Sequence, residues 1–365
     1  MAHPVRDADF AHYPAVRTFR EEAYVNEKVK HAGKKLGLVL DLDMTLVHAV
    51  QESAFADFPF DSALMGSVKF GYESTGPEIF SLLLDDVPYV LKLRPGVRNF
   101  LTELSSLYEL NIFTKATRPY LNFLMAALDP DRRLFATAVS RDDAPELDVD
   151  TKVMGLVSDR PLSELVIFDD RQTVWRDCPD NVIRAEPYMF LERKMGSLAA
   201  AITNRSNVCD DNDRQLTYIA AALKTVHTEF TRHRGLVAVS DVLRKVRAQA
   251  LVGCRVMFSG LTKDDVPVFQ AHVELLGGEN AGEDEDLGLE NKVTHLLVVG
   301  KNNTKKVYDA RRSQGKIKAL HGSWLSLAIS TWSRPPEDAF DLARFPCDVD
   351  GRVSTDIDPW DFLPK

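Results

Sequence analysis

Short apolar runs that end in acidic or hydroxyl side chains recur along the first half of the chain. Such runs occupy residues 36–43, 108–115 and 162–171, and each has the length and composition of a buried parallel strand. Helical patterns at 94–108 and 117–130 lie on either side of the second run. Because strands alternate with helices, the pattern predicts an α/β fold built on a doubly wound parallel sheet.

A loop-rich stretch at about 48–92 interrupts this alternation. It closes with the apolar residues 79–93, which predicts a small β-insertion directly after the first strand. An insertion at this place stands over the carboxyl end of the sheet, where it can act as a cap or a substrate-binding flap.

The second half of the chain changes from a helical pattern to another α/β alternation. Strands are predicted at 255–260 and 292–300, and an apolar helix at 323–332. The last residues are acidic and aromatic, and we expect them to be loosely held. The chain is therefore divided into a charged helical segment (1–35), an α/β domain (36–200), a helical linker (201–250), a compact α/β domain (251–345) and a tail (346–365).

Composition narrows the function classes. Of the 365 residues, 45% are hydrophobic and 27% are charged, which is ordinary for a globular protein. The formal net charge of -9 is unfavourable for gripping nucleic acid, so no direct nucleic-acid binding is expected. The sequence has no secretory signal and no apolar run of the roughly 20 residues that span a membrane. Four widely separated cysteines indicate neither zinc nor a disulfide framework. We expect a soluble intracellular protein.

Polar side chains gather at the ends of the three predicted strands. Asp41 and Asp43 close the first, Thr114 the second, and Asp169 and Asp170 the third. The carboxyl ends of parallel strands meet at one edge of a sheet, where α/β proteins bind their ligands. Oxygen ligands without nearby histidine or cysteine favour Mg²⁺ over zinc. The sequence therefore predicts a magnesium site at this edge.

A carboxylate beside Mg²⁺ can attack phosphorus and form an aspartyl-phosphate. A second carboxylate two residues further along can protonate the leaving oxygen and then activate water. A hydroxyl and an ammonium group are needed to hold the phosphoryl oxygens. Thr114 supplies the hydroxyl, and Lys152, just before the third strand, is the candidate for the ammonium group.

These residues resemble a known pattern. The segment DLDMT matches the DxDxT signature of haloacid-dehalogenase-like phosphotransferases. The ordered series DLDMTLVH, KLRPGVRNFL, YELNIFTKATRPYL, SRDD, TK and FDDRQTVW resembles the RNA polymerase II C-terminal-domain phosphatases. The order continues through the helical segment into residues 251–345, as in the TFIIF-associating type. The resemblance covers most of the chain and implies nuclear localisation.

The resemblance also implies roles for individual residues. Asp41 is the implied nucleophile and Asp43 the general acid and base. Asp41, the Asp43 backbone carbonyl and Asp170 are the implied Mg²⁺ ligands, Thr114 and Lys152 hold phosphate, and Asp169 orients Lys152 and water. Two departures stand out: the stretch SRDDAPELDVDTK is shorter and more acidic than the family pattern, and Thr173 replaces the usual acid.

Three further residues are implied to bind the substrate or to support the site, namely Arg94, Tyr108 and Arg141. An alternative remains open for two of them. Arg94 can instead pair with a surface acid, and Tyr108, like Trp175, has the character of a core aromatic residue.

Residues 251–345 resemble a BRCT domain, with Trp324 as its buried tryptophan. Some BRCT domains bind phosphoserine through a Ser/Thr-Gly pair and a lysine, and Ser259, Gly260 and Lys306 occupy the matching positions. The alternative is a domain that only packs.

The leading hypothesis is a Mg²⁺-dependent protein-serine phosphatase acting on the phosphorylated heptads of RNA polymerase II, with TFIIF as a candidate further partner and no membrane association. Two alternatives remain. One is a catalytically inactive scaffold that carries a phosphopeptide-binding BRCT domain, and the other is a phosphatase for nucleic-acid ends or small phosphate esters.

Overall fold

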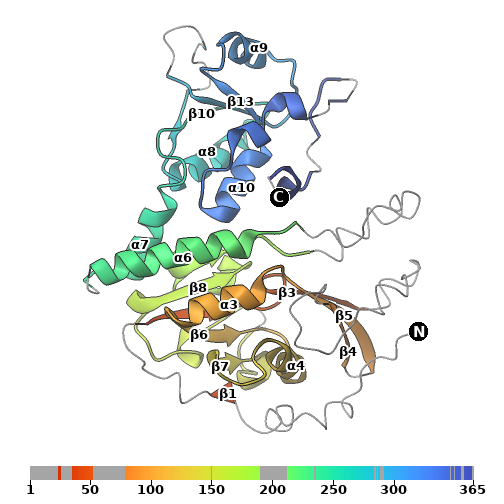
Figure 1. Ribbon diagram of the computed structural model, residues 1–365, viewed down its shortest axis with the longest axis vertical. Helices are drawn as coiled ribbons and strands as arrows, with labels where there is room; N and C mark the ends of the chain where they lie inside the picture. Colours follow the sequence, from red (N-terminus) through yellow and green to blue (C-terminus); the bar gives the residue numbers. More distant parts are fainter. Residues whose placement is uncertain are drawn as a thin grey trace. The chain divides into compact units, whose positions relative to one another are not determined.

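The computed structural model describes residues 24–25, 35–51, 79–84, 86–148, 150–189, 212–233, 236–282, 285, 287, 292–345, 347–348, 350–354 and 357–363. The chain forms two compact units, Met1–Ser240 and Asp241–Lys365, and each is described by itself. The division lies ten residues before the predicted start of the second α/β domain at 251. Figure 1 shows the elements of both units.

The first unit is built on a six-stranded sheet in the order β1-β7-β6-β2-β8-β9. Its strands are β1 (Tyr24–Val25), β2 (Leu36–Leu40), β6 (Tyr108–Phe113), β7 (Phe135–Val139), β8 (Leu165–Asp169) and β9 (Val182–Arg184). All neighbours are parallel except β1, which pairs antiparallel with β7. The strand order reverses direction at β2, so the crevice at the carboxyl ends of β2 and β8 is the expected ligand position.

Burial explains why β2, β6 and β8 form the centre of this sheet. Every residue of these three strands is buried, as the continuous apolar runs predict for strands covered on both faces. On one face, the Phe168 ring of β8 packs at 6.0 Å from Phe100 of helix α3 (Val97–Ser105). The alternate residues of β8 point to the opposite face, where they join a second apolar layer.

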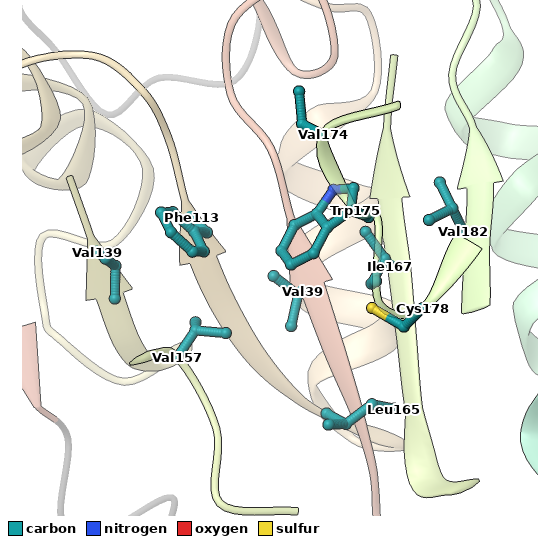
Figure 2. Close-up of a cluster of buried hydrophobic side chains, with 10 residues drawn as sticks. All are labelled: Val39, Phe113, Val139, Val157, Leu165, Ile167, Val174, Trp175, Cys178 and Val182. Atoms are coloured by element: carbon teal, nitrogen blue, oxygen red, sulfur yellow. The ribbon is translucent and has the colours of Figure 1, made fainter. Parts of the chain in front are cut away.

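That second layer is a cluster of buried side chains around Trp175 (Figure 2). The Phe113 and Trp175 rings meet edge to face at 5.7 Å. Figure 2 shows the Trp175 indole over the sheet, with its nitrogen toward the carboxyl end of the strands. The other members of the cluster are Val39, Val139, Val157, Leu165, Ile167, Val174, Cys178 and Val182.

Within the described part of the first unit, three helices accompany the sheet: α3 (Val97–Ser105), α4 (Arg118–Leu128) and α6 (Gln215–Arg232). Short 3₁₀ turns occupy Arg141–Asp143, Met154–Leu156, Leu162–Glu164, Gln172–Val174 and Pro179–Asn181. Helix α6 packs against α3 (Figure 1) and buries an apolar stripe that includes Leu216, Ile219 and Leu223. It therefore belongs to the core of the first unit and is not a free linker.

The predicted β-insertion is present as a separate three-stranded antiparallel sheet. Its strands are β3 (Val47–Gln51), β4 (Ile79–Leu84) and β5 (Val87–Leu93), in the order β3-β5-β4. Residues 52–78 of the predicted insertion lie outside the described residues.

The second unit carries a four-stranded parallel sheet in the order β11-β10-β12-β13. The strands are β10 (Arg255–Ser259), β11 (Glu279–Asn280), β12 (His295–Val298) and β13 (Lys318–His321), and the helices are α7 (Val239–Arg247), α8 (Val266–Leu275), α9 (Lys305–Arg312) and α10 (Ser323–Thr331). Helix α7 crosses the division between the units. As predicted, Trp324 is fully buried, and its ring stacks on His295 at 5.1 Å.

Two expectations for the chain's end segments are wrong. The tail is not loosely held, because Trp360 is only 3% exposed and the Phe362 ring lies 4.7 Å from Phe345. Its last 3₁₀ turn, Pro359–Phe362, packs against α10, so apolar burial outweighs the polar composition. The N-terminal helix does not cover Tyr24–Val25, which pairs with β7 instead; most of its predicted span lies outside the described residues.

The described residues of the second unit also form three-residue 3₁₀ turns at Glu337–Ala339 and Leu342–Arg344. Among the described helices, none has both the length and the apolar character that crossing a bilayer requires.

Candidate active site

Three neighbouring strands deliver acidic and hydroxyl groups to one edge of the first sheet. Asp41 follows β2, Thr114 follows β6, and Asp169 is the last residue of β8. Backbone pairing continues past the end of β2, since the Asp41 N–H donates to the Phe168 carbonyl at 3.0 Å. The pairing register of the sheet therefore determines the backbone positions from which these side chains extend.

Lys152 joins two of the acids. Its Nζ donates to Asp41 Oδ1 at 2.6 Å and to Asp169 Oδ2 at 2.8 Å, and the residue is only 5% exposed. The backbone N–H of Lys152 donates to the Val174 carbonyl at 2.8 Å, which places the lysine at the sheet edge. The acidic loop that precedes Lys152 thus still delivers the ammonium group to the nucleophile candidate.

Asp169 is held by donors on both carboxylate oxygens. The Trp175 indole Nε1–H donates to Oδ2 at 2.8 Å, and the Arg171 backbone N–H donates to Oδ1 at 2.8 Å. Oδ2 also accepts a hydrogen bond from Lys152 Nζ, so Asp169 holds the ammonium group in a fixed orientation.

Two hydroxyl groups hold Asp43. The Tyr120 hydroxyl donates to Oδ1 at 2.6 Å, and the Thr114 hydroxyl donates to Oδ2 at 3.3 Å. Tyr120 lies in the first turn of α4, so this helix positions the carboxyl group proposed to act as acid and base.

The turn after Asp43 is tight. Met44 has a φ of 57°, which is unusual for a residue other than glycine. Its N–H donates to the Val47 carbonyl at 2.7 Å, and the Thr45 hydroxyl accepts from the Asp170 N–H at 3.1 Å. This turn therefore connects the end of β2 to the end of β8.

Four carboxyl groups lie close together in a space that is largely buried, namely those of Asp41, Asp43, Asp169 and Asp170. Burial raises the pKa of Asp41 to about 8; Lys152 opposes this shift, while Asp169 and Asp43 add to it. Burial, together with Asp169, raises the pKa of Asp170 to about 6, and burial raises the pKa of Asp43. The pKa of Lys152 is raised despite its burial, because Asp41 and Asp169 favour its charged form. Three raised carboxyl pKa values indicate a site that favours an additional positive charge.

The donor set fits a divalent cation. Among the described residues, Asp41, Asp169 and Asp170 each place a carboxylate oxygen within 4.8 Å of the others. Since both oxygens of Asp169 accept hydrogen bonds from the protein, Asp41 and Asp170 are the carboxylates best placed to hold the cation. Hard oxygen donors of this kind suit Mg²⁺.

Arg94 does not reach this space with its guanidinium group. It is fully buried, and it donates from Nε and Nη2 to Asp213 at 3.0 and 2.8 Å. Its Nη1 donates to the Thr45 carbonyl at 3.0 Å. Of the two implied roles, these bonds favour support of the site over contact with the substrate, because each of them is made to the protein.

Tyr108 lies at the opposite end of β6 from Thr114, six residues and therefore about 20 Å away. It is fully buried, and its hydroxyl donates to the Leu223 carbonyl of α6 at 2.7 Å. This burial and this hydrogen bond favour the core-aromatic alternative, and a substrate role for Tyr108 stays an untested prediction.

Arg141 remains near the site and exposed. Its backbone N–H donates to the Ala116 carbonyl at 3.1 Å, beside the loop that follows Thr114. Its side chain is 56% exposed, with Asp142 at 3.6 Å. A substrate role for Arg141 stays a prediction.

Sequence reasoning missed two residues of the site, Tyr120 and the indole N–H of Trp175. Both sit on apolar faces where the local pattern signals burial alone. Their hydrogen bonds to Asp43 and Asp169 cannot be predicted from the local pattern, because these contacts form only in the folded structure.

The residues predicted to form a phosphate pocket in the second unit also come together. Ser259 lies 3.0 Å from Thr304 between hydroxyl oxygens, and Lys306 Nζ donates to the Phe258 carbonyl at 3.3 Å. Gly260 has a φ of +90° and touches Gly300 so closely that a side chain would clash. Phosphate binding by this group stays a prediction.

The model of the NLI interacting factor-like phosphatase family matches residues 36–229. The chain belongs to this family. The match extends from the start of β2 to within the last turn of α6, and it contains all the residues of the candidate site.

Two curated relatives share most of the chain. An RNA polymerase II C-terminal domain phosphatase of Caenorhabditis elegans is 27% identical over 327 residues, covering 85% of this chain and 46% of that protein. RNA polymerase II C-terminal domain phosphatase-like 4 of Arabidopsis thaliana is 29% identical over 330 residues, covering 85% and 71%. The chain thus spans less than half of the worm protein.

The solved structure of Fcp1, an essential RNA polymerase II CTD phosphatase, covers 84% of this chain and 96% of its own, with a TM-score of 0.58 and 24% identity. This likeness shows the fold. The predicted fold class is confirmed in its architecture: a doubly wound α/β sheet with a β-insertion, a helical segment and a C-terminal α/β domain.

Proposed function

We propose that this chain is a Mg²⁺-dependent protein-serine phosphatase that works through an aspartyl-phosphate on Asp41. The observation that carries the proposal is the Lys152 bridge between Asp41 and Asp169, with Asp43 held two residues from the nucleophile. A family of phosphatases and a complete set of reactive groups support the same activity.

In the first step, an Asp41 carboxylate oxygen attacks the phosphorus atom, and the bond from phosphorus to the serine oxygen breaks. Asp43 gives its proton to that oxygen as it leaves. The raised pKa of Asp43 favours the protonated form that this step requires. Lys152 and Thr114 hold the phosphoryl oxygens.

In the second step, water attacks the aspartyl-phosphate and Asp43 takes its proton, which releases inorganic phosphate and restores the Asp41 carboxylate. When bound, Mg²⁺ neutralises charge on the transferring group and favours ionised Asp41. Asp169 keeps the Lys152 ammonium directed at the reacting group, and the Trp175 indole keeps Asp169 in place.

The proposed substrate is the phosphorylated heptad repeat (YSPTSPS) of the RNA polymerase II C-terminal domain. The names of the worm and plant relatives support this assignment. Exposed Arg141 beside the β6–α4 loop can contact a phosphopeptide, and nuclear localisation follows from the substrate. TFIIF remains a candidate partner.

Asp41→Asn is expected to abolish hydrolysis of a phosphoserine heptad peptide in the presence of Mg²⁺, because an amide cannot form the acyl-phosphate. Released phosphate, measured for the full chain and the variant, is the readout. Asp241→Asn, an exposed acid of the second unit, is the matched control and is expected to keep its activity. Undiminished turnover by Asp41→Asn would refute the mechanism.

The same assay separates the alternatives. A scaffold would release no phosphate and would form no beryllofluoride adduct at Asp41. A phosphatase for nucleic-acid ends would turn over a 5′-phosphorylated oligonucleotide faster than the phosphopeptide. The intact set of Asp41, Asp43, Lys152 and Asp170 supports catalysis over the scaffold.

A further inference from the structure

A buried guanidinium connects the segment just before helix α6 to the turn that follows β2. Arg94 and Asp213 are 119 residues apart, yet they form two parallel bonds of 3.0 and 2.8 Å. The Arg94 side chain is 0% exposed and that of Asp213 is 8% exposed. A bidentate pair of this kind fixes the guanidinium in orientation as well as position.

The third nitrogen of Arg94 acts on the turn after β2. Nη1 donates to the Thr45 carbonyl at 3.0 Å, and the neighbouring Met44 carbonyl accepts from the Tyr188 N–H at 2.7 Å. Two successive carbonyls are therefore held by groups from outside the turn. This support matters because Met44 occupies a backbone conformation that a side chain disfavours.

The same turn sets the place of Asp170. The Thr45 hydroxyl accepts from the Asp170 N–H at 3.1 Å. A displacement of Thr45 would move the end of β8 relative to Asp41. The contacts form one continuous series from Asp213 through Arg94 and Thr45 to Asp170.

We propose that Asp213 is a positioning residue for the metal-binding acids. It holds Arg94 against the Thr45 carbonyl, and through Thr45 it fixes the spacing between Asp41 and Asp170. The consequence for metal binding rests on the proposed function, whereas the effect on the turn does not. Helix α6, whose first residues follow Asp213, thus belongs to the catalytic unit.

A second ion pair offers a matched control. Lys224 of α6 and Glu103 of α3 lie 2.5 Å apart, and both side chains are about half exposed. Glu103→Gln weakens an ion pair between α3 and α6 without touching Thr45. Comparison with Asp213→Asn therefore separates general helix docking from the support of the turn.

The first measurement is amide hydrogen exchange of the metal-free full chain, followed in peptides that cover residues 41–47 and 168–172. Asp213→Asn is expected to accelerate exchange in both segments, since Thr45 loses its anchor. Glu103→Gln is expected to leave both unchanged. Unaltered exchange in Asp213→Asn would overturn the proposal.

The second measurement is Mn²⁺ binding, followed by electron paramagnetic resonance. Asp213→Asn is expected to weaken binding by about tenfold, the lower end of the effect of losing a direct partner of a metal ligand, because Asp213 acts on Asp170 only through Arg94 and Thr45. Glu103→Gln should bind like the wild type. A wild-type chain that bound no Mn²⁺ would contradict the proposed function, while the exchange data would still decide the role of Asp213.

A double variant addresses the risk that Asp213→Asn unfolds by leaving Arg94 unpaired. Arg94→Met with Asp213→Leu removes both charges, and such replacements of buried pairs often preserve stability. Because no unpaired charge remains, the double variant should melt near the wild-type temperature. It also lacks the bond to the Thr45 carbonyl, so it should still bind Mn²⁺ weakly. Wild-type Mn²⁺ affinity in this double variant would overturn the proposal.

Discussion

The carboxyl groups at the sheet edge are in competition for protons, for Lys152 and for a cation. Burial is the main cause of the raised pKa values of Asp41 and Asp170. Lys152 bridges Asp41 and Asp169. A cation held by Asp41 and Asp170 would remove the excess negative charge that burial makes unfavourable.

Metal affinity should therefore depend on pH near the pKa of Asp170, about 6. Below that pH the group holds a proton that the cation must displace, and Asp41, with a pKa of about 8, holds another, so affinity is expected to fall as pH decreases from 7 to 5, by about tenfold per pH unit for each proton displaced. Mn²⁺ titrations across this range would measure the effect. An affinity that rises toward pH 5 would contradict the assignment of Asp170 as a ligand.

The stability of the metal-free protein should show the opposite trend. The folded pKa values of Asp170, about 6, and Asp41, about 8, lie above the reference value of 3.8. The folded state thus binds protons more tightly than the unfolded state, and stability from these groups is lost as pH rises from 4 toward 8. Thermal melts with chelator, and with Asp170→Asn as a control of weaker dependence, test this.

The secondary-structure elements that carry the site residues determine which parts of the site could be predicted from the sequence. Apolar runs of five or six residues followed by acids are a local signal, so β2, β6 and β8 with Asp41, Asp43 and Asp170 follow from the pattern. Tyr120 has no such signal, since its partner Asp43 is 77 residues away. Asp213 could not be predicted from the sequence either, because its partner Arg94 is 119 residues away and its own segment has the helical pattern of a linker.

Strand direction explains why Tyr108 lies far from the candidate acids. A residue at the start of a parallel strand lies at the edge opposite to the ligand site, whatever family motif contains it. The structure gives it a different task, which is to tie β6 to α6 through the Leu223 carbonyl.

Tyr108→Phe should therefore lower the free energy of unfolding of the first unit by about 1 kcal/mol, the usual value of one buried hydrogen bond. The kcat/KM for a phosphopeptide should stay within twofold of wild type. Urea unfolding and steady-state kinetics measure the two effects. A selective rise in KM with unchanged stability would return Tyr108 to the substrate site.

At the scale of the whole molecule, two units with separate cores share one chain. The second unit depends on residues that composition marked as a polar tail. Trp360 is buried against the unit, and Phe362 extends the row of rings formed by Phe340 and Phe345. Spaced aromatic residues in the acidic sequence were the available signal, and their burial needs the surface of α10 to be in place.

Trp360→Ala should destabilise the second unit by about 3–5 kcal/mol, as expected for truncating a buried aromatic side chain. Tyr308→Ala is the control, because Tyr308 is 58% exposed. Chemical denaturation followed by hydrogen exchange in each unit would locate the effect. An equal loss of protection in residues 36–51 would show that the two cores are not independent.

The separation between Arg94 and Asp213 has a consequence for synthesis on the ribosome. All the strands that carry the candidate acids have been translated once Asp170 is made. Arg94, however, then waits for the carboxylate that pairs with it, and Asp213 is still 43 residues away. A nascent chain released before α6 would hold an assembled sheet around an uncompensated guanidinium. The first unit is thus expected to become active only late in translation, after Asp213 and helix α6 have been synthesised.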